Sequence, residues 1–245
     1  MHVLVGLPYS PWSEKARWAL DLRRVPYRWR TYSPILGEPE LRVALRRPLG
    51  TVSVPVLFPE GGRAIDDSLA IARFADARGE GPSLFPPEHD VGAWVARSER
   101  ALAAGRARSL VRMLLDDEAL AEMVPRPMRA LGPVAVAIGR AGVARTLRKY
   151  GGHRARPAEH EAALACELDA LRAALAGKGP KGLIFGALTF ADVAMAQALA
   201  FVRPPPFGLR LGAASRRSFT DPELAERYAD LLEWRDALYE AHRPR

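Results

Sequence analysis

The chain has 245 residues, of which 49% are hydrophobic and 26% are charged, and its formal net charge is +8. This composition is typical of a soluble globular protein. The single cysteine, Cys166, excludes a disulfide framework and a multi-cysteine metal site. The five histidines show no metal-ligand spacing, so we expect no bound metal. We find neither a signal-peptide pattern nor an apolar run long enough to span a membrane, and we therefore expect a cytoplasmic location.

The stretch from Tyr9 to Leu20 begins where a predicted strand gives way to a helix. Residues 3–7 form a short apolar run that is typical of a buried strand. Ser10 and Pro11 then precede a run of helix formers, as a cap and a first-turn proline do at a helix N-terminus. Backbone N–H groups and the helix dipole stabilise negative charge at such a point. We therefore expect Ser10 to lie where a thiolate would be stabilised.

The following segment predicts a small α/β unit. Residues 25–32 alternate bulky and polar side chains, which indicates a strand with one buried face. Residues 54–58 form an apolar strand that contains Pro55, and a central strand rejects proline unless the strand begins there or the bond is special. The remaining elements are a short helix over residues 38–47, a hairpin turn over residues 59–62 and a helix that begins at Asp67-Ser68.

Beyond residue 90 the chain shows helical periodicity and no convincing strand. Long helices are predicted over residues 91–115, 159–175 and 222–242. A further helix begins at Thr189, which forms a capping box with Asp192.

The two halves of the sequence predict two domains. Residues 1–78 form the α/β domain, and residues 91–245 form an all-helical domain. Residues 79–90 are rich in proline and glycine and predict the linker between them.

The start of the first helix resembles a known family. Ser10-Pro11-Trp12-Ser13, aligned with the Cys-Pro-x-Cys start of glutaredoxin-like helices, resembles the serine-type glutathione transferases, in which serine replaces the first cysteine. That family combines a thioredoxin-like α/β domain with an all-α domain, so the resemblance covers nearly the whole chain. It implies an enzyme that stabilises the glutathione thiolate with the Ser10 hydroxyl and conjugates it to a small hydrophobic electrophile. It also implies a homodimer active in detoxification, with glutathione as co-substrate and no cofactor.

The resemblance also suggests how glutathione would be held. A cis peptide bond at Pro55 would expose the backbone of Val54 for pairing with the cysteinyl part of glutathione. Asp67 and Ser68 would hold the γ-glutamyl end. Asp67 stands where the family usually has Glu or Gln, and it is one methylene shorter.

Three residues near Ser10 leave alternatives open. Tyr9 is the rival catalytic residue, because other classes of the family use a tyrosine near the end of this strand. Ser13 and Trp12 are further candidates for the glutathione site. Ser13 is also suited to supporting the helix start, and Trp12 can either line the mouth of the site or pack in the core.

Two other functions compete with conjugation. A glutathione-transferase-like binding or scaffold protein would keep the fold without turnover. A thiol-disulfide reductase is the weaker alternative, since serine at position 10 leaves no redox cysteine in the site.

The basic segment, residues 126–157, carries the whole charge excess, with eight basic residues and no Asp or Glu. No nucleic-acid-binding module accompanies it, so we expect no nucleic-acid partner. Its apolar middle, residues 134–138, allows two interpretations. We favour a helical connection whose apolar residues pack on the second domain while its arginines stay solvated. The alternative is an element that contacts an anionic membrane surface.

Overall fold

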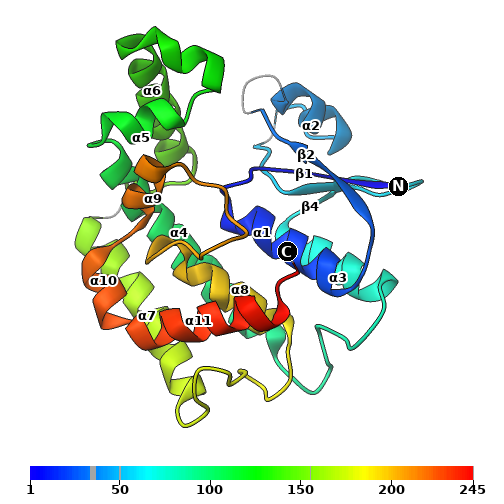
Figure 1. Ribbon diagram of the computed structural model, residues 1–245. Coiled ribbons are helices and arrows are strands. Elements are labelled where there is room, and N and C mark those ends of the chain that lie inside the picture. Colours follow the sequence, from blue (N-terminus) through cyan, green and yellow to red (C-terminus); the bar gives the residue numbers. More distant parts are fainter. Residues whose placement is uncertain (34–36, 50, 155, 245) are drawn as a thin grey trace.

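The computed structural model describes residues 1–33, 37–49, 51–154 and 156–244 (Figure 1). Its N-terminal part contains a four-stranded sheet with the strand order β2-β1-β3-β4. The strands are β1 (His2–Gly6), β2 (Tyr27–Thr31), β3 (Val56–Phe58) and β4 (Ile65–Asp66). β1 pairs in parallel with β2 and antiparallel with β3, and β3 pairs antiparallel with β4 across the predicted hairpin.

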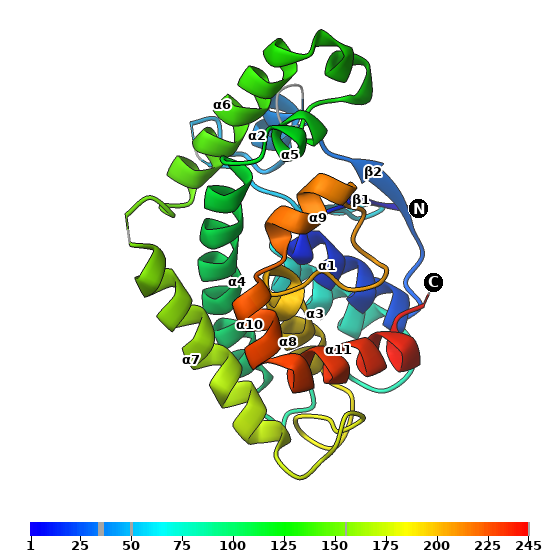
Figure 2. The ribbon, with the colours of Figure 1, turned by 60° about the vertical axis from the view of Figure 1, so that its left-hand side comes forward.

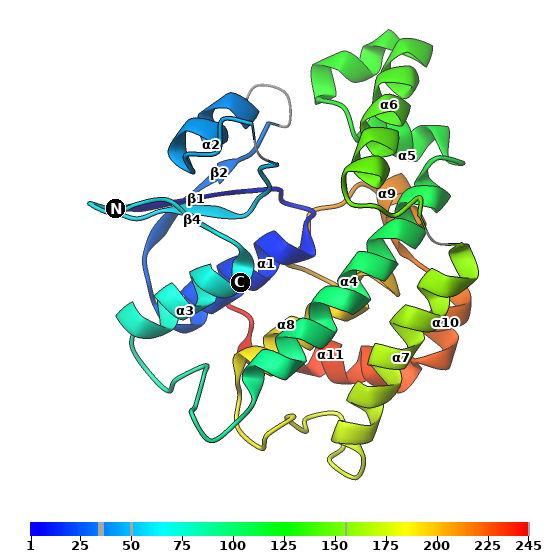
Figure 3. The same cartoon turned by 180° about the vertical axis from the view of Figure 1, so that it is seen from behind.

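Helices cover both faces of this sheet. α1 (Pro11–Leu22) and α3 (Ser68–Arg78) lie on one face, and α2 (Glu38–Ala44) lies on the other (Figures 1 and 3). The predicted order of strands and helices is confirmed. One face of β2 packs on the core through Tyr27 and Trp29, as expected. No residue of β2 is fully buried, because β2 is an edge strand and its neighbours cover it only in part.

The rest of the chain is helical, and no strand is found in its described residues. The long helix α4 (Val91–Met113) packs between α7 (Pro157–Leu175) and α8 (Phe190–Ala198) (Figure 2). The other helical elements are α5 (Asp117–Glu122), the 3-10 helix η1 (Arg126–Leu131), α6 (Pro133–Lys149), the 3-10 helix η2 (Leu199–Phe201), α9 (Ala213–Phe219), α10 (Pro222–Arg227) and α11 (Ala229–His242).

The helix predicted over residues 222–242 is two helices. Tyr228 separates α10 from α11, with φ −114° and ψ 32°. Its ring is fully buried, and its hydroxyl donates to Asp169 Oδ1 at 2.8 Å. Local periodicity therefore predicted the helical character but not the break at a buried tyrosine.

The capping box at the start of α8 is confirmed. Asp192 is fully buried and accepts hydrogen bonds from the backbone N of Thr189 at 2.9 Å and of Ile184 at 2.8 Å. Burial raises the pKa of the Asp192 carboxyl, and these hydrogen bonds oppose the shift. Loss of such a cap costs about 1 kcal/mol.

One continuous core joins the sheet to the helices. α1 packs on both α3 and α8, so its apolar residues belong to the same core as those of the helical part. The ring of Trp18 lies 4.6 Å from that of Tyr239 on α11, and its Nε1 donates to the carbonyl of His242 at 2.9 Å. The helical part thereby fixes the position of α1. None of the helices in the described part of the chain has the length and hydropathy needed to cross a bilayer.

Candidate active site at the start of α1

Ser10 lies at the turn from β1 to α1, as the sequence predicts. Its backbone is extended, and its Oγ accepts a hydrogen bond from the backbone N of Ser13 at 3.4 Å. Pro11 takes the first helical position, where its missing N–H costs nothing. No acceptor for the Ser10 hydroxyl hydrogen is found among the described residues, and the side chain is half-buried. This hydroxyl therefore keeps a donor for a ligand at the positive end of the helix.

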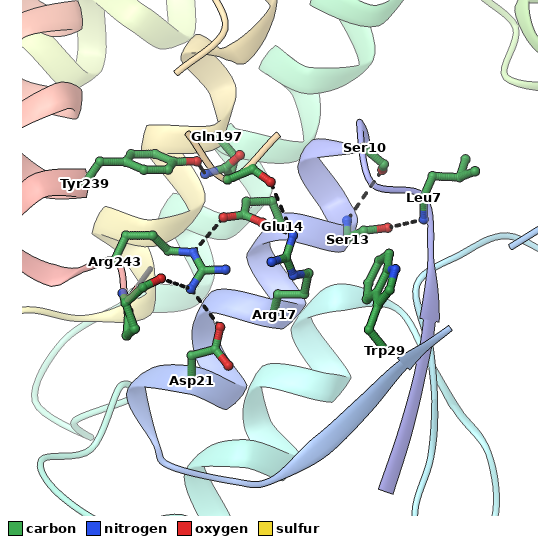
Figure 4. Close-up of polar contacts among 12 residues, drawn as sticks. Leu7, Ser10, Ser13, Glu14, Arg17, Asp21, Trp29, Gln197, Tyr239 and Arg243 are labelled. Carbon is green, nitrogen blue, oxygen red and sulfur yellow. Dashed lines mark hydrogen bonds and ion pairs between the residues drawn. The ribbon is translucent and has the colours of Figure 1, made fainter. Parts of the chain in front are cut away.

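Ser13 ties the strand to the helix. Its side chain is fully buried, and its Oγ accepts a hydrogen bond from the backbone N of Leu7 at 3.1 Å (Figure 4). A Cβ at Gly6 would lie 2.7 Å from this Oγ, so the close approach of β1 to α1 requires glycine there. Ser13 thus positions the turn that carries Ser10.

Tyr9, the rival to Ser10, is adjacent to it at the end of the same turn. Burial raises the pKa of the Tyr9 phenol. The phenol therefore stays protonated at neutral pH and remains a hydrogen-bond donor. Tyr9 and Ser10 therefore both present a neutral hydroxyl that can donate a hydrogen bond. Substitution of each residue tests which of the two is catalytic.

The peptide bond between Val54 and Pro55 is cis, as the resemblance implies. Pro55 is buried directly before β3, and Val54 is half-buried.

Asp67 and Ser68 lie at the start of α3. Asp67 has a φ of 76°, in a region that residues other than glycine rarely adopt, and its exposed carboxylate accepts a hydrogen bond from the backbone N of Leu69 at 3.1 Å. Ser68 is only 1% exposed, and its Oγ has no partner among the described residues. The Asp67 carboxylate is therefore used to cap its own helix, whereas the Ser68 hydroxyl is unpaired.

An ion pair between a buried lysine and a partly exposed glutamate, missing from the sequence prediction, holds the start of α1 against α4. Lys15 is fully buried and forms an ion pair with Glu99. Glu99 also accepts a hydrogen bond from Trp12 Nε1 at 2.7 Å. Burial lowers the pKa of the Lys15 ammonium, and Glu99 opposes the shift.

The end of the basic segment reaches the same region. The guanidinium of Arg106, on α4, lies 4.6 Å from the ring centroid of Trp12 and 3.8 Å from that of Tyr150, the residue after α6. Lys149 Nζ donates to the carbonyl of Val52 at 2.6 Å, two residues before Val54. The final turn of α6 therefore lies against the loop that leads to the cis-proline.

The structure confirms one part of the prediction for residues 126–157 and corrects the other. The arginines are exposed, as expected, and two of them also form ion pairs, Arg140 with Asp117 and Arg145 with Glu38 in the N-terminal part. The apolar run does not pack fully, because Val134 is 56% exposed and Ile138 is 37% exposed. Contact of this segment with a membrane surface stays a prediction.

Comparison with known proteins identifies the N-terminal domain. Residues 9–78 match the family model described as the glutathione S-transferase N-terminal domain. This part of the chain is therefore a glutathione S-transferase N-terminal domain. A curated relative, a probable glutathione S-transferase from Solanum tuberosum, is 32% identical over 90 residues. That match covers 35% of this chain and spans 37% of the relative's length.

Solved members of the glutathione S-transferase family share the fold of the whole chain. A glutathione S-transferase of Ceriporiopsis subvermispora, solved in complex with glutathione, has a TM-score of 0.64 at 20% identity and covers 100% of this chain and 98% of that one. A glutathione transferase family member from Pseudomonas fluorescens, solved with bound glutathione, has a TM-score of 0.59 at 18% identity, with both chains covered completely. This chain therefore shares the fold of these solved proteins, a thioredoxin-like N-terminal domain followed by a mostly helical region.

The far side of α1 carries a second charge cluster (Figure 4). Arg243, near the C-terminus, pairs with Glu14 at 2.6 Å and with Asp21 at 2.7 Å. The Arg243 and Glu14 side chains are 2% and 1% exposed. The end of the chain therefore fixes α1 on the side opposite the turn that carries Ser10.

Sequence reasoning missed Lys15, Glu99, Arg106, Lys149 and Tyr150 as neighbours of the site. Only Lys15 could have been suspected from the sequence. It lies five residues after Ser10 in the predicted helix, and a lysine that becomes buried there needs a partner. Its partner lies 84 positions away, and no local pattern marks it.

Proposed function

We propose that this protein is a glutathione transferase in which the Ser10 hydroxyl stabilises the thiolate of bound glutathione for attack on a small hydrophobic electrophile. The main supporting observation is the placement of Ser10, which caps α1 at the positive end of the helix and whose hydroxyl hydrogen has no acceptor among the described residues. The match of residues 9–78 to the glutathione S-transferase N-terminal domain and the glutathione bound in solved proteins of the same fold support the choice of ligand.

The chemistry requires only that the thiol ionise near neutral pH. A cysteine thiol has a pKa of about 8.5, so a few per cent is thiolate at neutral pH. A hydrogen bond to a charged group is worth about 1.5–3 kcal/mol, and 1.36 kcal/mol corresponds to one pKa unit. The Ser10 hydroxyl would therefore lower the thiol pKa by about one to two units. Ser10 donates a hydrogen bond throughout and is never the nucleophile.

The transfer step is a displacement or addition at carbon. The thiol proton leaves to solvent, and the thiolate sulfur then attacks the electrophilic carbon. With an aryl halide a C–S bond forms and the carbon–halogen bond breaks, with the halide leaving with the electron pair. No oxidant or reductant takes part.

The remaining site residues hold the tripeptide in this proposal. The Val54 backbone, set by Pro55, pairs with the cysteinyl part. Asp67 and Ser68 hold the γ-glutamyl end, and the buried Ser68 hydroxyl must change rotamer to reach it. Trp12 lines the mouth of the site, and Ser13 supports the turn.

The proposal also includes the oligomeric state, the cellular role and the domain boundaries, which rest on the resemblance to the family. They are a homodimer, a cytoplasmic role in detoxification, and a division into an α/β domain of residues 1–78, a linker of residues 79–90 and a helical domain of residues 91–245. Analytical ultracentrifugation tests the dimer.

The decisive experiment compares Ser10→Ala with Tyr9→Phe. We expect Ser10→Ala to lower kcat/KM for glutathione conjugation roughly 10–100-fold, because it removes one hydrogen bond to a charged sulfur. Tyr9→Phe serves as the matched control, since it removes the neighbouring hydroxyl. Calorimetry should show that both variants still bind glutathione. A silent Ser10→Ala beside a damaging Tyr9→Phe would reverse the assignment.

A scaffold without turnover is the second candidate, and the state of α3 favours it. The Asp67 carboxylate is exposed but already caps its own helix, and the Ser68 side chain is buried, so neither predicted γ-glutamyl contact is ready for a ligand. Retention on a glutathione column without conjugation of several electrophile classes would favour the scaffold over the transferase.

A further inference from the structure

Five arginines lie along α4, and four of them have an acidic partner. Arg97 and Arg100 pair with Glu167. Arg108 and Arg112 pair with Asp221. Arg106 is the exception: no carboxylate lies within ion-pair distance of it among the described residues.

The position of Arg106 is nevertheless well defined. The ring of Trp12 lies on its guanidinium from α1, and the ring of Tyr150 lies on it from the end of α6. Rings attract a guanidinium through their faces, but they carry no charge that would neutralise it. Figure 3 shows α4 running past the start of α1 toward α6, which is why one arginine can meet both rings.

The carboxylate of Glu99, whose field acts on Arg106, already has other partners. Glu99 lies two turns before Arg106 on the same helix, but its carboxylate pairs with Lys15 and accepts from Trp12 Nε1. Burial lowers the pKa of the Arg106 guanidinium, and the fields of Tyr150 and Glu99 only partly offset it. Arg106 is thus a largely desolvated cation without a counter-ion of its own.

The surroundings of Arg106 are cationic and adjoin the proposed thiolate. Trp12, which touches Arg106, is in the first turn of α1, two residues after Ser10. Lys149 lies on the other side, at the carbonyl of Val52, and Arg106 is among the charges whose fields lower its pKa. A ligand that reaches the sulfur therefore meets positive charge beside two aromatic rings.

We propose that the electrophile conjugated at this site carries a carboxylate, and that Arg106 pairs with it while Trp12 and Tyr150 contact its apolar body. This inference rests on the proposed transferase function and narrows its substrate class. The anion would supply to Arg106 the counter-charge that Glu167 and Asp221 supply to the four other arginines of α4.

The test uses a chloronitrobenzoate and its methyl ester, which share the leaving group and differ in charge. Chloride leaves from the ring carbon that the sulfur attacks, and each rate is divided by the spontaneous rate with glutathione. We expect the wild-type protein to favour the carboxylate at least about tenfold in corrected kcat/KM. Arg106→Gln should lower this ratio about tenfold or more. Arg100→Gln, on the same helix but paired with Glu167, should change it less than about twofold.

Several results would overturn the inference. A wild-type preference for the ester would do so, and so would an Arg106→Gln variant that loses both substrates equally. A rise in the KM for glutathione alone would show that the guanidinium binds the tripeptide instead.

A binding measurement separates this inference from the transferase function. Calorimetry with nitrobenzoate and its methyl ester needs no turnover. If the protein conjugates neither arene but binds nitrobenzoate in a manner that depends on Arg106, the function fails and the anion site stands. If it conjugates both arenes without preference, the function stands and the anion site fails. Absence of any nitrobenzoate binding also overturns the anion site.

Discussion

Two arginines on opposite sides of α1 show what pairing does to a buried charge. Arg243 lies between Glu14 and Asp21, whereas Arg106 lies between the rings of Trp12 and Tyr150. Burial alone would lower the pKa of both guanidinium groups. Around Arg243 the two carboxylates outweigh burial and raise the pKa above its ordinary value, but at Arg106 burial prevails. The charge of Arg243 is therefore neutralised within the protein, while that of Arg106 remains available to a ligand.

The difference has a consequence for stability. Breaking a buried ion pair leaves a charge without a partner, which costs several kcal/mol, whereas replacing an unpaired desolvated cation by an apolar group removes a penalty. The same contrast appears within α4. Arg108 and Arg112 both pair with Asp221, whereas no ion pair of Arg106 is found among the described residues.

The largest effect is expected at the C-terminal end. Arg243→Met should lower the free energy of unfolding by about 3 kcal/mol, because the buried Glu14 loses its buried partner and keeps only the partly exposed Arg17. Urea unfolding followed by circular dichroism measures the loss. Arg24→Met is the matched control, since Arg24 is 79% exposed and should cost less than about 0.5 kcal/mol. A loss below about 1 kcal/mol for Arg243→Met would contradict a structural role for the pair.

A smaller, pH-dependent effect is expected at Asp221. Burial opposes ionisation of its carboxyl, but the pairs with Arg108 and Arg112 prevail and hold its pKa below the usual value. A lowered folded-state pKa gives stability that is present above the unfolded pKa of about 3.9 and is lost as pH falls through the folded value. Asp221→Asn should therefore cost about 2–3 kcal/mol near neutral pH.

Acidification provides the check on Asp221. The gap in the free energy of unfolding between wild type and Asp221→Asn should narrow as the pH falls below about 4, because the wild-type carboxylate becomes protonated there. Urea unfolding at several pH values follows this gap. A gap that stays constant over the range would show that the loss comes from packing and not from charge.

The smallest effect on stability is expected at Arg106. Arg106→Met should change the free energy of unfolding by less than about 1 kcal/mol in either direction, because its charge has no acidic partner to strand and methionine keeps contact with both rings. Thermal and urea unfolding beside Arg243→Met measure the contrast. If Arg106→Met and Arg243→Met lower the free energy of unfolding equally, Arg106 is a structural residue, and its charge does not differ in role from that of Arg243.

The sequence by itself determined those features whose partners lie within a few positions. Ser10 as a helix cap, the proline before β3 and the Thr189-Asp192 capping box follow from local backbone chemistry, which a short stretch of sequence contains in full. The alternation of strands and helices in the N-terminal part is local in the same sense.

Tertiary structure alone decided which charges meet. Glu14 and Arg243 are 229 positions apart, and Lys15 and Glu99 are 84 apart. Arg106 meets Trp12 and Tyr150 only because α4 passes between the start of α1 and the end of α6. A charged residue in a helix has the same local pattern whether it is later solvated, paired or left buried without a partner. Its role is settled only when distant elements pack and remove water from around it.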